Sequence, residues 1–223
     1  MIIAIDGPAA SGKSSTADAV ARRLGFRHLE SGAFYRAVTY AAMRRRIPPA
    51  EWDSLDGARL DALDITVEPA DTGFRLRVDG RDVSEEIRAA EVNANVSTMA
   101  RVPAVRAWLL DTLRATARDT DLVADGRDIG TVVFPDADLK VFIVAAAETR
   151  ARRRLIQMGM PLDSDTVAEE VRRIEERDRI DSSRAVAPLK RAADAVLLDT
   201  THLTFDEQVE RIVEMARARM RAR

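Results

Sequence analysis

The sequence feature that most constrains the fold is the glycine-rich stretch GPAASGKSS at residues 7–15. The apolar residues 2–5 before it predict a short buried strand, and apolar residues at helical spacing after it end at Gly25. Its spacing, Gly-x-x-x-x-Gly-Lys-Ser, is that of a loop whose backbone N–H groups hold a phosphate at a helix N-terminus. Strand, glycine loop and helix in this order predict an α/β fold with a nucleotide site at the loop.

Two side chains of this loop suit the chemistry of a nucleoside triphosphate. Lys13 is expected to reach the β- and γ-phosphates of ATP, and the Ser14 hydroxyl is expected to ligate Mg²⁺. Lysine occurs elsewhere only at positions 140 and 190 although the chain has 35 Lys and Arg residues, so its use here indicates a need for a slim ammonium group. A flexible turn with a solvated lysine is the alternative interpretation. The predicted ATP site comprises Gly7, Pro8, Ala9, Ala10, Ser11, Gly12, Lys13, Ser14 and Ser15.

Length and composition indicate a single globular domain without a membrane segment. The 223 residues suit one α/β domain, and the net charge of −2 gives no overall attraction to nucleic acid or an anionic membrane. The longest apolar run, residues 141–147, is too short to span a bilayer. The absence of cysteine excludes disulfides and thiolate metal sites and fits a reducing cytoplasm. We expect a cytoplasmic monomer with no nucleic-acid or membrane partner.

Strand-like runs alternate with helical patterns along most of the chain, which predicts a parallel sheet flanked by helices. Residues 65–83 differ, because they predict a small antiparallel hairpin or three-stranded piece inside an insert of roughly residues 60–100. Ligands of open α/β sheets bind beyond the carboxyl ends of the strands, so the residues that follow each strand are candidates for the site. The five strand-like runs are residues 2–6, 27–30, 121–125, 139–144 and 195–199.

Two segments that follow predicted strands contain charged candidates. Asp125 ends an apolar run, where it could lie near Mg²⁺, and Arg127 and Asp128 follow directly; an ordinary Asp-Gly turn is the alternative. In ESGAFYR, residues 30–36, Ser31 could be a helix N-cap, and Arg36 on the first helical turn is expected to contact phosphate.

Two arginine-containing helical segments lie in the second half of the chain. ETRARRR, residues 148–154, suits a lid that closes over a polyphosphate, although a solvated basic face would explain it equally well. A helix over 166–181 is predicted to open with a capping box of Thr166 and Glu169. Later in this segment, Arg177, Asp181 and Arg184 share a face if the helix continues, and a surface ion-pair ladder is the alternative.

These arginines together favour a kinase over a GTPase. Phosphoryl transfer between two nucleotides brings many negative charges together, and proteins catalyse it by positioning and electrostatic clamping. The Asn-Lys-x-Asp signature by which GTPases read guanine is absent from the sequence.

Five stretches in this order resemble the bacterial cytidylate kinases of the nucleoside monophosphate kinase family: GPAASGKSS, ESGAFYR, VSEEIR, ADGRDIGTVVFPDA and SSRAVAPL. The resemblance extends nearly end to end. It implies a P-loop kinase with a five-stranded parallel sheet and helices on both faces, plus a small antiparallel insert in the monophosphate-binding region. It further implies a single domain, residues 1–223. Its expected parts are a core (1–35, 101–145 and 182–223), the monophosphate-binding region with its insert (36–100) and a lid (146–162).

The resemblance implies transfer of the γ-phosphoryl group of MgATP to CMP or dCMP, with roles for individual residues. Arg36, Arg127 and Arg177 would clamp the acceptor phosphate. The implied catalytic residues are Lys13, Arg127, Arg150, Arg153, Arg154 and Arg177. The implied acceptor site is Ser31, Tyr35, Arg36, Ser97, Arg106, Arg127, Asp128, Asp181 and Arg184, of which Ser97, Arg106 and Asp128 would read cytosine and Asp181 and Arg184 would hold the ribose. The implied metal site is Ser14 and Asp125.

The base-reading roles also agree with the chemistry of cytosine. Its N4 amino group can donate to a carboxylate such as Asp128, and Arg106 can donate to the ring N3 and O2. For Ser97 the sequence alone indicates only a polar residue in a helical stretch, and His28 and His202 are expected to be structural. Two alternatives stay open: another small P-loop kinase that acts on UMP, AMP or a non-nucleotide such as shikimate, and a non-catalytic nucleotide-sensing regulator.

Overall fold

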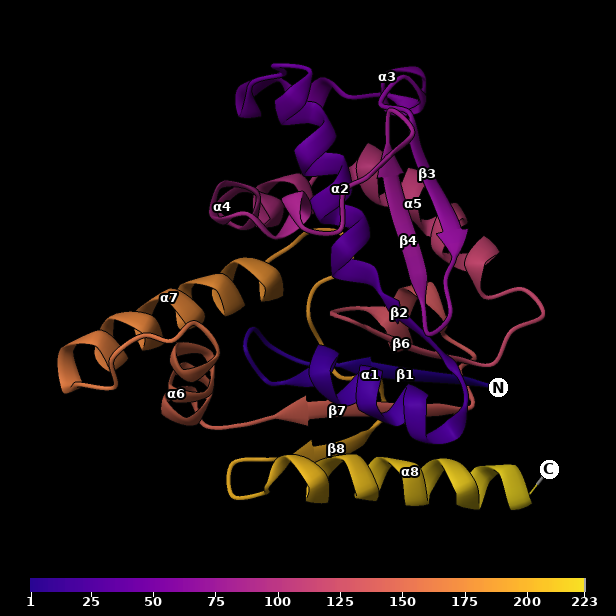
Figure 1. Ribbon diagram of the computed structural model, residues 1–223, viewed down its shortest axis with the longest axis vertical. Helices are drawn as coiled ribbons and strands as arrows, with labels where there is room; N and C mark the ends of the chain where they lie inside the picture. Colours follow the sequence, from indigo (N-terminus) through magenta and orange to yellow (C-terminus); the bar gives the residue numbers. More distant parts are fainter. Residues whose placement is uncertain (223) are drawn as a thin grey trace.

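The computed structural model describes residues 1–222 and contains, within them, a central five-stranded parallel sheet (Figure 1). The strand order is β2-β6-β1-β7-β8, so the first strand of the chain lies in the middle. Each strand lies within one residue of its predicted position, which confirms the predicted sheet. The strands are β1 (Ile2–Asp6), β2 (Arg27–Glu30), β6 (Leu122–Gly126), β7 (Leu139–Val144) and β8 (Val196–Asp199).

Helices cover both faces of this sheet because its central strands are apolar on both sides. Ile3 and Ile5 of β1 face α1 (Lys13–Leu24) and α8 (Phe205–Arg221), and they belong to one buried cluster with residues of both helices. Ala4, between them, belongs to the cluster on the opposite face, which contains residues of α2 (Ser31–Arg44) and α5 (Pro103–Thr116). Helix α1 ends at Gly25 in the left-handed conformation, as predicted, and Pro103 begins α5.

A second, antiparallel sheet of three strands lies in the region between α2 and α5, as predicted for residues 65–83. It consists of β3 (Ile65–Pro69), β4 (Phe74–Val78) and β5 (Arg81–Asp82). The turn between β3 and β4 lies against the edge strand β2, where the His28 N–H donates to the Thr72 carbonyl at 2.9 Å. A Cβ atom at Gly73 would lie 2.9 Å from the His28 carbonyl oxygen, so this close approach requires glycine.

Within residues 1–222, five short helical segments connect the elements described so far: two precede β3, two follow β5 and one follows β6. They are η1 (Pro49–Ser54), α3 (Gly57–Asp61), η2 (Glu86–Arg88), α4 (Ala90–Met99) and the π-helical turn η3 (Ile129–Val133).

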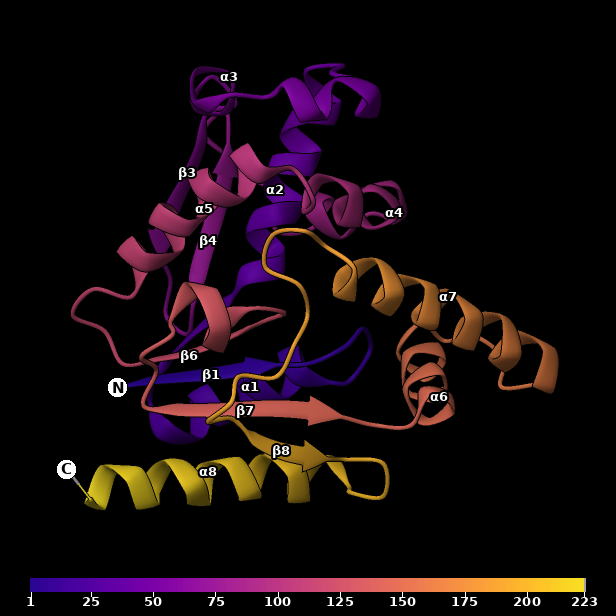
Figure 2. The ribbon, with the colours of Figure 1, turned by 180° about the vertical axis from the view of Figure 1, so that it is seen from behind.

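Two further helices, α6 (Ala147–Gln157) and α7 (Ser164–Ser182), form an arm beyond the carboxyl end of β7 (Figures 1 and 2). The predicted capping box at Thr166 is wrong, because α7 begins earlier, with Asp163 as its N-cap. The Asp163 carboxylate accepts from the backbone N–H of Thr166 at 3.0 Å and from its hydroxyl at 2.8 Å. Both hydrogen-bonding groups of Thr166 are therefore engaged inside the first turn. A complete capping box occurs instead at the start of α8, between Thr204 and Glu207.

Candidate active site

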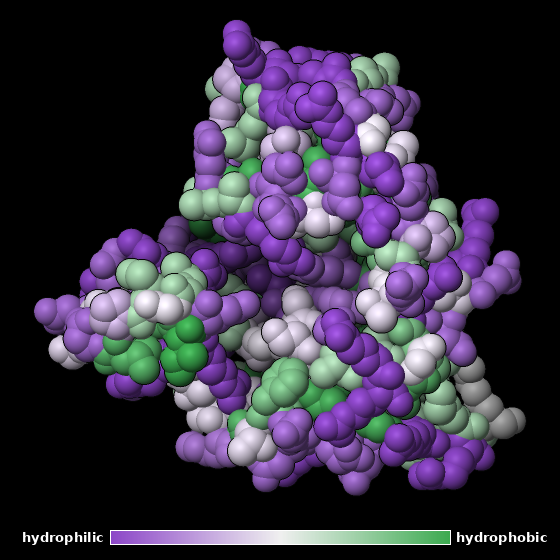
Figure 3. Space-filling view, in the orientation of Figure 1, coloured by the Kyte–Doolittle hydropathy of each residue, from purple (hydrophilic) through white to green (hydrophobic). Residues whose placement is uncertain are grey.

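The candidate active site lies at the carboxyl ends of the central parallel strands. The loop 7–15 follows β1, the DGRD segment at 125–128 closes β6, and the α6–α7 arm follows β7. In the space-filling view the surface is hollowed between this arm and the body of the molecule, and hydrophilic residues surround the hollow (Figure 3). Segments distant in the chain thus meet at one edge of the sheet, as the parallel topology requires.

The glycine loop has the geometry of an anion site. A Cβ atom at Gly7 would lie 2.4 Å from the backbone oxygen of Ile143, so only glycine allows this approach of loop and strand. Gly12 precedes α1 with φ of 80°, and no side chain among residues 1–222 caps the first turn of that helix. The N–H groups of the helix N-terminus are therefore left for a ligand.

Lys13 is buried under this loop. Its Nζ donates to the Pro8 carbonyl at 3.1 Å, and only 7% of the residue is exposed. Burial, together with the positive charges of Arg127 and Arg177, lowers the pKa of Lys13 from 10.5 to about 7. A bound phosphate would add negative charge beside the amine and restore the ordinary charge of the lysine.

Ser14 and Asp125 meet as the sequence predicts for a metal site. The Ser14 hydroxyl donates to Asp125 Oδ2 at 2.5 Å, and Asp125 is 2% exposed. Burial opposes ionisation of Asp125, but the hydrogen bond and charge of His28, the charge of Lys13 and the Ser14 hydroxyl hold its pKa below the ordinary value. A hydroxyl and one carboxylate are hard oxygen donors, and this small set fits Mg²⁺ that is held partly by nucleotide phosphates. Residues 1–222 contain no cluster of three or more His, Cys, Asp or Glu ligands that would bind a metal alone.

Unpartnered donor atoms surround the loop and the arm. Among residues 1–222, buried side-chain atoms without a hydrogen-bond partner include Ser11 Oγ and the Nε atoms of Arg36, Arg177 and Arg184. Buried polar groups are almost always satisfied, so four donors of predicted site residues without acceptors indicate a site for an anionic ligand. Burial and the charge of Arg127 lower the pKa of Arg177 to about 10, against the opposing charge of Asp181.

Carboxylates hold Arg127 and also the other guanidinium nitrogens of Arg36 and Arg184. Arg127 Nε donates to Asp181 Oδ2 at 2.8 Å, and Arg184 contacts the other oxygen of the same carboxylate. Asp181 is 1% exposed, so this carboxylate joins the end of α7 to the segment after β6. Arg36 contacts Glu30, and α7 ends at Ser182, so Arg184 lies just beyond the predicted helical face.

A second buried cluster contains the predicted cytosine-reading residues. Arg106 from α5 contacts Asp128, and the side chains of both are 6% exposed. Arg106 also donates to the Ala100 carbonyl at 3.1 Å and lies 5.4 Å from the ring centre of Tyr35, a cation–π distance. Burial raises the pKa of Asp128 and outweighs the opposing charge of Arg106. Ser97 is half-buried on α4, and within residues 1–222 no observed contact joins it to this pair, so its role remains a prediction.

The structure corrects one interpretation and adds two residues to the site. Ser31 does not cap α2, whose N-terminus has no side-chain cap among residues 1–222; its hydroxyl instead donates to the Asp125 carbonyl at 2.8 Å. His28, which the sequence suggests is only structural, places Nε2 2.8 Å from Asp125 Oδ1. Asp6 accepts from the N–H groups of Ile129 and Gly130, each at 2.8 Å, and burial raises its pKa to about 6. Asp6 thus joins the end of β1 to the segment after Asp128, and the only local sequence signal for this contact is its position directly before Gly7.

The predicted lid arginines are engaged by protein groups in this conformation. Arg150 is buried and donates to the Ala9 carbonyl at 2.7 Å and to Asp178 at 2.6 Å, so it joins α6 to the loop and to α7. Arg153 donates to the Thr200 carbonyl at 2.6 Å, and Arg154 pairs with Glu170 at 2.9 Å. Their proposed contacts with phosphate are therefore predictions about a closed state.

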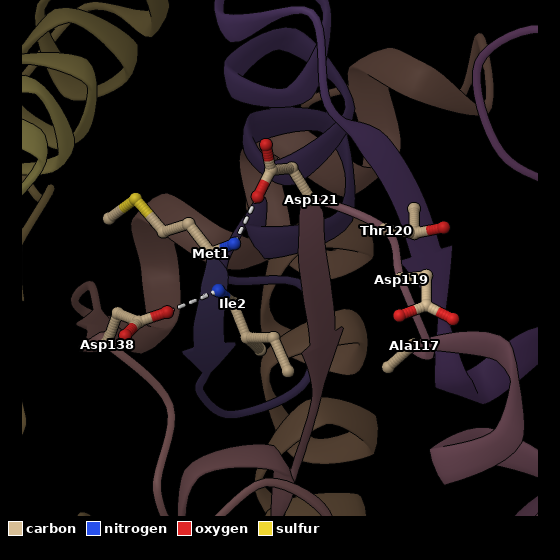
Figure 4. Close-up of a pocket in the computed structure, with 7 residues that line it drawn as sticks. All are labelled: Met1, Ile2, Ala117, Asp119, Thr120, Asp121 and Asp138. Atoms are coloured by element: carbon tan, nitrogen blue, oxygen red, sulfur yellow. Dashed lines mark hydrogen bonds and ion pairs between the residues drawn. The ribbon is translucent and has the colours of Figure 1, made fainter.

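The cavity shown in Figure 4 lies at the opposite, amino end of the sheet and does not belong to the site. This hollow of about 460 Å³ is lined by Asp119, Asp121 and Asp138, among others. The amino group of Met1 contacts Asp121, and the Ile2 N–H donates to Asp138 at 2.6 Å. Asp121 and Asp138 therefore hold the start of β1 between its neighbouring strands.

A glycine loop between a central parallel strand and a helix, with a serine and a strand-end aspartate beside it, defines this protein as a P-loop nucleotide-binding protein. A solved structure from Eubacterium ventriosum, described as an uncharacterized protein, has the same fold with a TM-score of 0.51 at 11% identity, covering 98% of both chains.

Sequence comparison then places the chain within this class. The sequence model of the cytidylate kinase family matches residues 3–218. A cytidylate kinase of Limosilactobacillus fermentum is 46% identical over 211 residues, which cover 94% of this chain and 92% of that protein. A cytidylate kinase of Desulfitobacterium hafniense is also 46% identical, over 96% of this chain and 91% of that protein. The chain belongs to the cytidylate kinase family.

Proposed function

We propose that this protein transfers the γ-phosphoryl group of ATP to CMP or dCMP and releases ADP with CDP or dCDP. Membership of the cytidylate kinase family and the names of its relatives support the activity. The single observation that supports the substrate best is the buried pair of Arg106 from α5 with Asp128, which follows Arg127 directly after β6. We further propose a cytoplasmic monomer; within residues 1–222, no helix is long and apolar enough to cross a membrane.

The proposed donor site is the glycine loop with Lys13 and Ser14. The backbone N–H groups of the loop and the helix N-terminus would bind the β-phosphate, and Lys13 would bridge toward the γ-phosphoryl group. Ser14 and Asp125 would hold Mg²⁺, which when bound neutralises charge on the phosphates. The buried donor Ser11 Oγ would gain an acceptor in this arrangement.

The proposed acceptor site places CMP between two groups of side chains. Arg36, Arg127 and Arg177 would bind its phosphate and reduce the repulsion between acceptor and donor. The attacking oxygen is already an anionic phosphate oxygen, so the reaction requires no general base. Asp181 and Arg184 would hold the ribose, and Arg150, Arg153 and Arg154 would bind phosphate when the arm closes.

Base selection would follow from the buried carboxylate. Asp128 can accept from the N4 amino group of cytosine, whereas uracil would face it with a carbonyl oxygen. A buried carboxylate left without a donor is costly, so discrimination against UMP is expected to be large. Arg106 would donate to the acceptors on the other ring atoms while the Tyr35 ring keeps its guanidinium in place.

The test is ADP release from MgATP with CMP, dCMP, UMP, AMP, GMP and shikimate offered separately as acceptors. Turnover restricted to CMP and dCMP would agree with the proposal. Turnover with a different acceptor would support kinase activity but refute the assignment of Asp128 and Arg106 as cytosine-reading residues. Calorimetric binding of ATP without turnover on any acceptor would favour a nucleotide-sensing regulator instead.

A further inference from the structure

His28 contacts the candidate metal site from the edge strand of the sheet. Its Nε2 lies 2.8 Å from Asp125 Oδ1, and its side chain is 13% exposed. On its other side, Nδ1 is 3.9 Å from the Asp18 carboxylate of α1, which is too long for a hydrogen bond. The firm polar contact of the ring is therefore the one with Asp125.

The two carboxylate oxygens of Asp125 are divided between two partners. Oδ2 accepts the Ser14 hydroxyl at 2.5 Å, and Oδ1 faces His28. A serine hydroxyl that ligates a metal does so through its oxygen, so its hydrogen must be directed to another acceptor. Asp125 Oδ2 is that acceptor. The orientation of the carboxylate therefore decides where the Ser14 lone pairs point.

The backbones on both sides of this contact are already fixed. The Ser31 hydroxyl holds the Asp125 carbonyl at 2.8 Å, and the Thr72 carbonyl holds the His28 N–H at 2.9 Å. With these backbones held, the Asp125 carboxylate can still rotate about its own side-chain bonds. The His28 ring is positioned to limit this rotation. Ligand-orienting contacts of this kind are typical beyond the direct ligands of metal sites.

We propose that His28 is a positioning residue, whose Nε2–H hydrogen bond orients Asp125 and thereby the Ser14 hydroxyl toward the Mg²⁺ of a bound nucleotide. The inference rests on the proposed function only insofar as the glycine loop binds a magnesium nucleotide. The ring is the donor in this bond, because an ionised carboxylate can only accept. His28 contacts neither reactant and acts through Asp125.

We expect substitutions of this ring to leave the fold intact. His28 lines a cavity of about 200 Å³ between α1, α2 and the β3–β4 hairpin, and that cavity also contains Phe34, Phe74 and Leu76 in its wall. His28→Leu removes the donor and adds apolar surface next to apolar neighbours. His28→Gln retains an N–H donor at about the distance of Nε2 from the backbone.

The experiment is calorimetric titration of ADP into wild type and both variants, with and without Mg²⁺. The factor by which Mg²⁺ strengthens ADP binding is expected to be about tenfold smaller in His28→Leu than in wild type. Without Mg²⁺, the variant should bind ADP within about twofold of wild type. His28→Gln is expected to stay within about threefold of wild type in both titrations. In turnover assays the KM for Mg²⁺ should rise in His28→Leu while the KM for CMP stays unchanged. His202→Leu, at the other histidine and exposed after β8, is the matched control.

Two results would overturn the proposal. One is an unchanged Mg²⁺ effect in His28→Leu; the other is an equal loss in the Leu and Gln variants, which would mean that the ring is needed only for packing. Thermal unfolding of each variant distinguishes a loss of positioning from a loss of fold. Failure of the proposed function gives a different pattern: absence of CMP turnover in wild type, while the tenfold effect of His28→Leu on Mg²⁺-dependent ADP binding persists.

Discussion

Lys13 is a buried amine whose charged form is disfavoured by burial and by two neighbouring arginines, so its removal is expected to stabilise the nucleotide-free protein while abolishing nucleotide binding. The residue is 7% exposed, and burial with the charges of Arg127 and Arg177 lowers its pKa from 10.5 to about 7. Lys13→Met retains most of the length of the side chain and removes the amine. The variant exchanges a functional charge for an apolar group in a buried position.

The magnitude follows from the pKa of Lys13. Because folding lowers this pKa, the unfolded chain binds more protons than the folded chain between pH 7 and pH 10.5. The contribution of Lys13 to stability is therefore most unfavourable below pH 7 and improves as the pH rises through this window. At 1.36 kcal/mol per pH unit, burying Lys13 costs about 4 kcal/mol at pH 7 and about 2 kcal/mol at pH 9. These values are the upper limits of what Lys13→Met can recover.

Urea unfolding at both pH values measures this difference, with an unchanged m-value as the check that both proteins expose the same surface. We expect Lys13→Met to be more stable by up to about 4 kcal/mol at pH 7, and by about half as much at pH 9. Calorimetry should detect no ADP binding to the variant. Lys190→Met, at an exposed position, is the matched control and should change stability by less than about 0.5 kcal/mol. A less stable variant at pH 7, or a gain that increases with pH, would refute the reasoning.

Three further predictions concern the same site. Asp128→Asn is expected to lower the CMP-to-UMP ratio of kcat/KM by about 10- to 100-fold, because an amide can donate to uracil O4; an unchanged ratio contradicts its role. Gly7→Ala places a Cβ atom 2.4 Å from the Ile143 oxygen, so calorimetric ADP affinity should fall at least about tenfold, whereas Gly57→Ala, with open space around it within the described chain, should retain it. ADP binding at pH 8 should take up about 0.9 proton as Lys13 regains its charge, measured in buffers of different ionisation enthalpy; zero uptake would exclude a neutral Lys13 in the free protein.

Local sequence patterns were sufficient for most secondary-structure elements. The five parallel strands are short apolar runs between turn residues, and each lies within one residue of its predicted place. The glycine loop is equally local, because nine consecutive residues contain the turn, the helix start and the lysine. The two wrong capping predictions, at Ser31 and Thr166, have a shared cause, because several polar residues near a helix start can cap it. Nearby hydrogen-bonding groups, such as the Asp125 carbonyl beside Ser31, decide which residue does.

Contacts between side chains far apart in the sequence depend on the order of the strands in the sheet. The spacing of residues along the chain does not reveal this order. β2 pairs with β6 rather than with β1, and only this arrangement brings His28 to Asp125. The pairing of Arg106 with Asp128 likewise depends on how α5 packs against the sheet.

The sequence by itself therefore determined the class of fold and the phosphate loop, because periodicity and loop spacing are properties of neighbouring residues. The tertiary structure alone decided which carboxylate each buried donor meets, since burial forces those groups to find partners across the fold.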